Sequence, residues 1–287
     1  MRADASNRYL LFFVFFFTMT FYTTLARHFH PPRYSLPFSL SSMRRVSAGR
    51  APQSPVQLRA FASASGVGAS NFELITLDAT GTLMTPRISV GEQYRNILAA
   101  TLDPAKGPEI VERVRALDEA TVTDGFMRAY KKNSERSPCF GALDGEGCVK
   151  WWRRTVWDTY MEVGVEPQVL ETPAKGRGSE LKTVFDKAFD VLYWEVFTGK
   201  EGWSLLPDTM EALRKLQHWR QTEGGAGCTL GCLSNFDERA ESLLIALGVR
   251  DFFDFVVLSS REGVEKPDPQ IFQKALEAAN KVRRDRG

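Results

Sequence analysis

Three short runs of apolar residues lie between segments of helical periodicity. They span residues 72–77, 228–233 and 252–258. Polar residues follow the first two runs directly, with Asp78 after one and Ser234 after the other. Apolar runs of this length, bounded by turn residues, are typical of buried strands. Because strands that alternate with helices favour a parallel sheet, the pattern predicts a Rossmann-like α/β fold.

A long stretch of helical periodicity, residues 89–199, interrupts this pattern. Apolar residues there recur three and four positions apart, as at Val90 and Tyr94, which is typical of amphipathic helices. Clusters of glycine and proline separate about four such helices. We therefore expect a helical bundle inserted into an α/β core, whose two parts are residues 71–88 and 200–287.

The second part of the core has helical periodicity of its own. Asp208 precedes one helix, at 209–220, and is expected to cap it. Asn235 and Glu238 have the spacing of a helix N-cap. The sequence therefore predicts a second helix, which spans 238–247 and is capped by Asn235.

Tryptophan is concentrated in the helical stretch. Four of the six tryptophans lie there: Trp151, Trp152, Trp157 and Trp194. They either fill the apolar core of the bundle, or one or two of them line a pocket that faces the sheet. The sequence leaves both interpretations open.

The first 70 residues differ from the rest in charge. They contain eight arginines, no lysine and a single acid, Asp4, so the remainder of a chain with net charge +2 is mildly acidic. A basic start, an apolar run from Leu10 to Phe17 and the small residue Ala26 indicate a signal peptide over residues 1–26. A membrane anchor and a wrongly assigned start codon are the alternative interpretations of the same run.

Residues 27–70 contain no acid and are rich in arginine and serine, which is typical of transit peptides. A flexible linker has a similar composition. A signal peptide followed by a transit peptide resembles the two-part leader of proteins delivered to plastids enclosed by extra membranes. We therefore expect a plastid location and no membrane contact after cleavage of the leader. Membrane-anchored, secretory and mitochondrial destinations are the alternatives.

The mildly acidic remainder of the chain lacks the basic patch that binds nucleic acid. His218 is the one histidine outside the leader, which argues against a histidine-based catalytic triad. The main candidate for chemistry is Asp78, which Thr80, Gly81 and Thr82 follow. An acid at the end of a strand, before a tight glycine turn, lies where parallel sheets bind ligands. We therefore expect a small-molecule substrate.

Three ordered motifs resemble those of the haloacid dehalogenase superfamily. They are the segment Asp78-Ala79-Thr80-Gly81-Thr82, the pair Ser234-Asn235 and the segment Lys266-Pro267-Asp268-Pro269. Each follows a predicted strand, and the resemblance covers about residues 71–280. It implies a hydrolase whose helical stretch is a cap domain. The string 233–239 and the tryptophan pair 151–152 are similar to one branch of the superfamily.

The resemblance also implies roles for individual residues. Asp78 would attack a phosphoryl group, and Lys266 would neutralise charge on the transferring group. The residues that would bind the substrate and its phosphate are Thr80, Gly81, Thr82, Ser234 and Asn235. A Mg²⁺ ion would be held by the Asp78 carboxylate and the backbone carbonyl of Thr80.

Two departures from the family pattern argue against fast turnover. Thr80 stands where phosphatases of the superfamily usually carry a second Asp, their general acid and base. The fourth motif, which supplies acids for Mg²⁺, is not found before Gly287, so we expect a core that is incomplete at its C-terminal end. Three hypotheses stay open: a hydrolase of a small phosphorylated metabolite with weak or lost activity, an inactive binding or regulatory protein, and a carbon–halogen hydrolase.

Overall fold

The computed structural model describes residues 73–105, 107–174, 182–222 and 225–286. The expected leader, residues 1–70, lies outside the described part of the chain. Within the described ranges, no helix is both long and apolar enough to cross a membrane.

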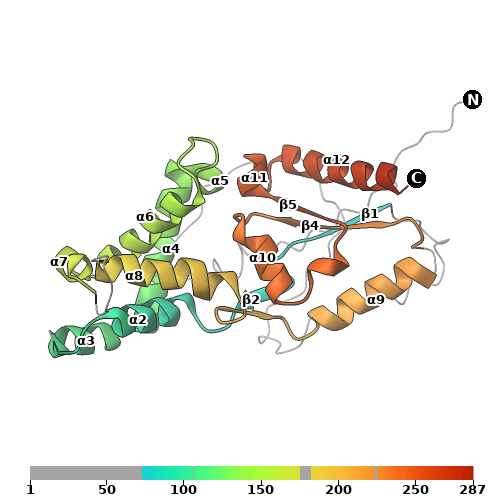
Figure 1. The fold of residues 1–287 in the computed structure, drawn as a ribbon. Coiled ribbons are helices and arrows are strands. Elements are labelled where there is room, and N and C mark those ends of the chain that lie inside the picture. The colour runs from blue at the N-terminus through green and yellow to red at the C-terminus, as the bar shows by residue number, and fades with distance from the viewer. Residues whose placement is uncertain (1–72, 106, 175–181, 223–224, 287) are drawn as a thin grey trace, which may run out of the picture. The chain divides into compact units, whose positions relative to one another are not determined.

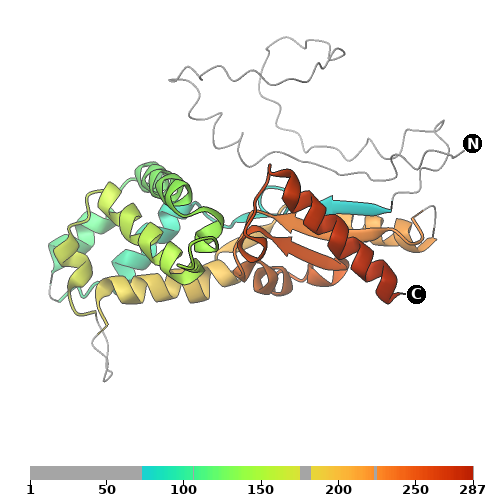
Figure 2. The same cartoon turned by 90° about the horizontal axis from the view of Figure 1, so that it is seen from above.

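A three-stranded parallel sheet forms the centre of the α/β core, as the sequence predicts. Its strands are β1 (Leu74–Leu77), β4 (Thr229–Ser234) and β5 (Phe255–Leu258), in the order β1-β4-β5. The register pairs Leu77 with Cys232, so the carboxyl ends of the strands meet at one edge of the sheet. Figure 2 shows the strand arrows pointing toward the helical insert.

Helices cover both faces of this sheet (Figure 1). On one face lie α9 (Thr209–Thr222) and α10 (Arg239–Ala246), and on the other lies α12 (Pro269–Asp285). Successive residues of a strand point to opposite faces, so Ile75 joins the apolar cluster of the first face and Leu74 that of the second. The short helical segments of the core are η4 (Arg250–Phe252) and α11 (Ser259–Glu262).

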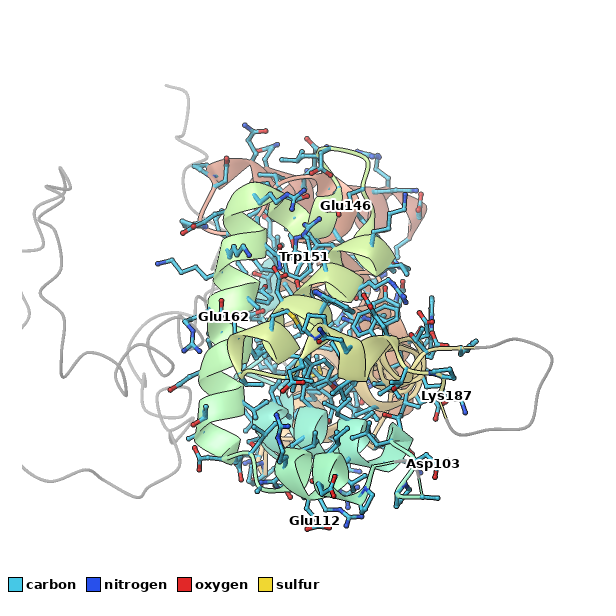
Figure 3. All side chains as sticks on the ribbon, turned by 90° about the vertical axis from the view of Figure 1, so that its left-hand side faces the viewer. Asp103, Glu112, Glu146, Trp151, Glu162 and Lys187 are labelled. Carbon is cyan, nitrogen blue, oxygen red and sulfur yellow. The ribbon has the colours of Figure 1, made fainter. Side chains whose placement is uncertain are left out.

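The insert is helical and has an apolar core of its own. Its elements are α2 (Val90–Thr101), α3 (Pro108–Arg115), α4 (Glu119–Arg136), α5 (Pro138–Gly141), α6 (Cys148–Glu162), α7 (Pro167–Glu171), α8 (Val184–Asp190), the π-helix η2 (Val191–Glu195) and the 3-10 turn η3 (Val196–Thr198). Tyr94 and Tyr160 belong to one buried cluster that is separate from those of the sheet. Trp151 is buried inside the insert, whereas the side chains of Glu112 and Glu162 lie on its outside (Figure 3).

A two-stranded antiparallel sheet joins the insert to the core. It pairs β2 (Met84–Pro86), which precedes the insert, with β3 (Trp203–Leu205), which follows it. The two chain crossings are therefore hydrogen-bonded to each other. A movement of the insert relative to the core must be absorbed at this pair or in the residues beside it.

The predicted elements differ from the observed ones mainly at their ends. β5 is shorter than its apolar run because Arg250–Phe252 form a 3-10 turn. The prediction of about four helices in the insert corresponds to α2, α4, α6 and α8. It omits α3, which has eight residues, and α5 and α7, which have four and five residues and are too short to reveal a helical period.

Candidate active site

Three polar side chains meet at the edge of the sheet where β1, β4 and β5 end. Lys266 Nζ lies 2.8 Å from Asp78 Oδ2, and Ser234 Oγ donates a hydrogen bond to Asp78 Oδ1 at 2.8 Å. The ion pair is largely buried, with 14% of the Lys266 side chain and 21% of the Asp78 side chain exposed. The convergence that the sequence predicts is therefore present, while the catalytic roles stay a prediction.

A tight turn follows Asp78 and fixes the direction of its carboxylate. Gly81 has a φ of 76°, a conformation that residues with a Cβ seldom adopt. The carbonyl of Ala79 accepts hydrogen bonds from the N–H groups of Leu83 and Met84. The backbone N–H of Ala79 donates to Asp78 Oδ1 at 2.7 Å. Gly81 thus forms the expected turn, and its contact with a phosphate stays a prediction.

The side chain of Asn235 holds the loop that carries Lys266. Its Nδ2 donates to the carbonyl of Lys266 at 2.9 Å, and its Oδ1 accepts from the Lys266 N–H at 2.7 Å. The expectation that Asn235 caps the next helix is wrong, because this loop uses its amide and Glu238 occupies the N-cap of α10. The geometry gives Asn235 a supporting role for Lys266, and the implied phosphate contact is not tested.

The two threonines of the turn differ in their surroundings. Thr82 Oγ1 is buried and has no hydrogen-bond partner among the described residues. A buried polar atom without a partner is unfavourable, so Thr82 Oγ1 offers a position for water or a ligand atom. Thr80 is half-buried and forms a β-bridge with Met84 through its backbone. The predicted phosphate contacts of both threonines stay predictions.

A second polar cluster, which the sequence did not predict, joins the core to the insert. Asp237 and Arg239, which lie just beyond β4, form a buried ion pair. The indole N–H of Trp152 donates to Asp237 Oδ2 at 2.6 Å, and the ring of Tyr193 lies against the Arg239 guanidinium. Trp152 therefore contacts a residue of the core, while Trp151 is buried in the insert, and the interpretation that a tryptophan lines a pocket facing the sheet stays a prediction. The acid and the arginine two residues apart were a weak sequence indication, because most such residues are exposed.

Comparison with known proteins decides the class of this fold. A family model described as a haloacid dehalogenase-like hydrolase matches residues 72–285. The chain belongs to the haloacid dehalogenase-like hydrolase family. The resemblance inferred from three motifs is thus confirmed, and the matched region includes the whole helical insert and all but the terminal residues of the core.

Similar proteins include vertebrate members of this family. Haloacid dehalogenase-like hydrolase domain-containing protein 3 of Mus musculus is 32% identical over 206 residues, which cover 72% of this chain and 68% of that protein. Its namesake from Danio rerio is 33% identical and covers 70% of this chain and 69% of its own length. Among solved structures, L-2-haloacid dehalogenase from Xanthobacter autotrophicus aligns at 19% identity with a TM-score of 0.40. That alignment covers 71% of this chain and spans 64% of the dehalogenase.

Members of this family generally use Mg²⁺, so the donor atoms near Asp78 bear on its binding. Mg²⁺ takes near-octahedral oxygen ligands, usually one or two carboxylates with water and phosphate. The Asp78 oxygens already accept from Ser234, Ala79 and Lys266. No group of three or more His, Cys, Asp or Glu side chains with metal-binding geometry occurs among the described residues. These residues do not by themselves fit a complete Mg²⁺ site, and the Asp78 and Thr80 ligands stay a prediction.

Replacing Asn235 with alanine removes both hydrogen bonds to the Lys266 backbone. We expect the free energy of unfolding to fall by about 1–3 kcal/mol, since each hydrogen bond contributes about 0.5–1.5 kcal/mol. Urea denaturation of the purified chain measures the change. Asn280→Ala, the same substitution at an exposed position of α12, is the control and should change stability by less than about 0.5 kcal/mol. Equal stabilities for the two variants would contradict the supporting role of Asn235.

Proposed function

We propose that this chain hydrolyses a small phosphorylated metabolite and uses Asp78 as its nucleophile. One observation carries the proposal. Ser234 Oγ and Lys266 Nζ, each at 2.8 Å, hold the Asp78 carboxylate at the edge of the sheet that faces the insert. A fixed carboxylate beside an ammonium group is suited to attack the electrophilic atom of an anionic substrate.

The reaction proceeds in two steps. In the first, an Asp78 oxygen attacks phosphorus, the bond from phosphorus to the leaving oxygen breaks, and the alcohol departs with a proton from water. In the second, water attacks the phosphorus of the aspartyl-phosphate, inorganic phosphate leaves and the Asp78 carboxylate is restored. Lys266 neutralises negative charge that spreads over the transferring group, and Ser234 donates a hydrogen bond to one of its oxygens.

Thr80 slows this chemistry. Its hydroxyl does not ionise near neutral pH and cannot replace a carboxylate as general acid or base, a group that contributes typically about 10²–10⁴-fold to the rate. Without a general acid or base at position 80, both the protonation of the leaving group and the activation of the attacking water are slower. We therefore expect weak steady-state activity and accumulation of the aspartyl-phosphate after the first turnover.

The insert acts as a cap in this proposal. Its helices lie beyond the carboxyl ends of the strands (Figure 2), and the β2–β3 pair joins it to the core. A cap above a nucleophile excludes bulk water and limits the size of the substrate. This arrangement supports a small metabolite as the substrate.

A carbon–halogen hydrolase is the second candidate. The observation that favours it is the donor set at Asp78, which has a lysine and a serine but falls short of a Mg²⁺ site among the described residues. In that reaction Asp78 displaces halide from carbon, and water then hydrolyses the resulting ester. Lys266 and Ser234 keep the same positions around the nucleophile.

The test is a rapid-mixing assay of the purified chain with an aryl phosphate, in buffer with and without Mg²⁺. We expect a burst of aryl alcohol that is stoichiometric with the chain, followed by slow release. Mass spectrometry of the quenched sample should find a phosphoryl group on the peptide that contains Asp78. A folded chain without a burst and without phosphorylated Asp78 would overturn the proposal. Halide release from a 2-haloacid would then favour the second candidate, and its absence an inactive binding protein.

A further inference from the structure

Arg239 is a charged side chain buried where the core meets the insert. The residue is 6% exposed, and its partner Asp237 is fully buried. Burying an ion pair costs several kcal/mol per charge unless further contacts compensate. The contacts around this pair come from both parts of the structure, so its position depends on how the two parts meet.

The pair itself is bidentate. Arg239 Nε donates to Asp237 Oδ1 at 2.9 Å, and a terminal nitrogen of its guanidinium donates to Oδ2 at 2.6 Å. Burial lowers the pKa of Arg239, whereas the charge and the hydrogen bond of Asp237, together with Tyr193 and Tyr94, raise it, so the net direction is upward and the cation persists. Asp237 Oδ2 also accepts the indole N–H of Trp152 at 2.6 Å.

Two aromatic rings of the insert enclose the guanidinium. The Arg239 Cζ lies 4.8 Å from the centroid of the Trp152 ring and 4.1 Å from that of Tyr193, distances at which cation–π attraction is strong. Tyr193 lies in the π-helix η2, a rare distortion that often occurs at functional positions. Trp152 stacks on Phe126 and Phe140, so its ring is fixed to the body of the insert.

We propose that Arg239, held by Asp237, is a positioning residue that seats the helical insert over Asp78 through the rings of Trp152 and Tyr193. Arg239 is five residues beyond Ser234, which donates to Asp78. The short segment from Ser234 to Arg239 therefore connects the residue that contacts Asp78 to the residue that positions the insert. The significance of Asp78 in this proposal rests on the proposed function, whereas the contact can be tested without substrate.

The alkylation rate of Cys148 measures whether the contact between Arg239 and the insert is intact. Cys148 is the first residue of α6, and its thiol is hydrogen-bonded to Glu238 of the core. Burial, together with that hydrogen bond, raises the pKa of the Cys148 thiol to about 12, so reaction with an alkylating reagent is slow while the insert is seated. Cys228 and Cys232 are buried in the core and report on unfolding of the sheet.

The experiment follows alkylation of each cysteine by iodoacetamide in the full chain, with peptides quantified by mass spectrometry. Tyr193→Leu keeps the ion pair but removes one ring, together with the hydrogen bond that the Tyr193 hydroxyl donates to Glu238 Oε1 at 3.3 Å. We expect it to raise the Cys148 rate by about 10- to 30-fold, the factor expected for a lost desolvated cation–π contact. Arg239→Met should raise the rate at least as much. Cys228 and Cys232 should stay protected in both variants.

Tyr193→Phe is the matched control, because it keeps the ring on the guanidinium and removes the hydroxyl with its hydrogen bond to Glu238, so it separates the effect of that bond from the effect of the ring. It should leave the Cys148 rate close to that of the unaltered chain. If Arg239→Met does not fold, Tyr193→Leu decides the question alone. A Cys148 alkylation rate unchanged by Tyr193→Leu would overturn the proposal. Equal labelling of Cys148, Cys228 and Cys232 in the variants would overturn it as well, because it would mean that the contact stabilises the whole fold and does not specifically seat the insert. Because alkylation needs no substrate, an inactive chain would still give the expected result.

Discussion

Asp78→Asn is expected to abolish both the burst of aryl alcohol and the steady-state turnover. The amide cannot form the aspartyl-phosphate, so the rate should fall by at least about 10³-fold, as for other nucleophile substitutions. Asparagine keeps the size of the side chain and can still accept the hydrogen bond that Ser234 donates. Rapid mixing with the aryl phosphate measures the loss, and circular dichroism checks that the fold is retained.

Asp251→Asn is the matched control for this substitution. Asp251 is exposed and lies in η4, before β5, and therefore near the opposite end of the strands from Asp78. The same chemical change there should leave the burst intact. An Asp78→Asn chain that retains the burst would show that another group attacks the substrate and would remove Asp78 from the mechanism.

The sheet and the convergence at Asp78 were accessible from the sequence for a simple physical reason. Strands of a parallel sheet are covered on both faces, so they consist of continuous apolar runs that end where the chain reaches the sheet edge. Leu74–Leu77 and Thr229–Ser234 follow this rule. Asp78 comes directly after the first strand, and Ser234 is the last residue of the second. Because all strands run in one direction, Asp78 and Ser234 had to come together.

The contacts between the core and the insert were not accessible in the same way. Trp152 and Asp237 are 85 residues apart, and neither lies in a periodic pattern that indicates the other. Asn235 illustrates the same limit. Its spacing to Glu238 fits a helix cap, but a tertiary contact with Lys266, 31 residues away, takes up its amide instead. Local propensity predicts elements, whereas competition among distant partners decides where a polar side chain points.

Lys266→Met is expected to lower the burst rate by about 10²–10³-fold, the usual loss when one preorganised donor to the developing charge is removed. Methionine preserves most of the aliphatic stem, so the substitution removes the ammonium with little change in packing. It deletes the contact with Asp78 Oδ2 at 2.8 Å and the hydrogen bond to the Leu233 carbonyl at 3.0 Å. The remaining Asp78 carboxylate can still attack, but the transferring group loses its nearest positive charge.

Two further substitutions, Lys274→Met and Lys266→Arg, separate this loss of rate from a general effect of removing a lysine. Lys274→Met, on α12, removes an ammonium that lies 3.8 Å from both Glu262 and Glu277, and should leave the burst unchanged. Lys266→Arg keeps the charge but not the shape, so its rate should lie between those of Lys266→Met and the unaltered chain. A Lys266→Met chain with an undiminished burst would mean that the ammonium serves only to hold the loop. Its neutralising role would then have to pass to a group supplied with the substrate.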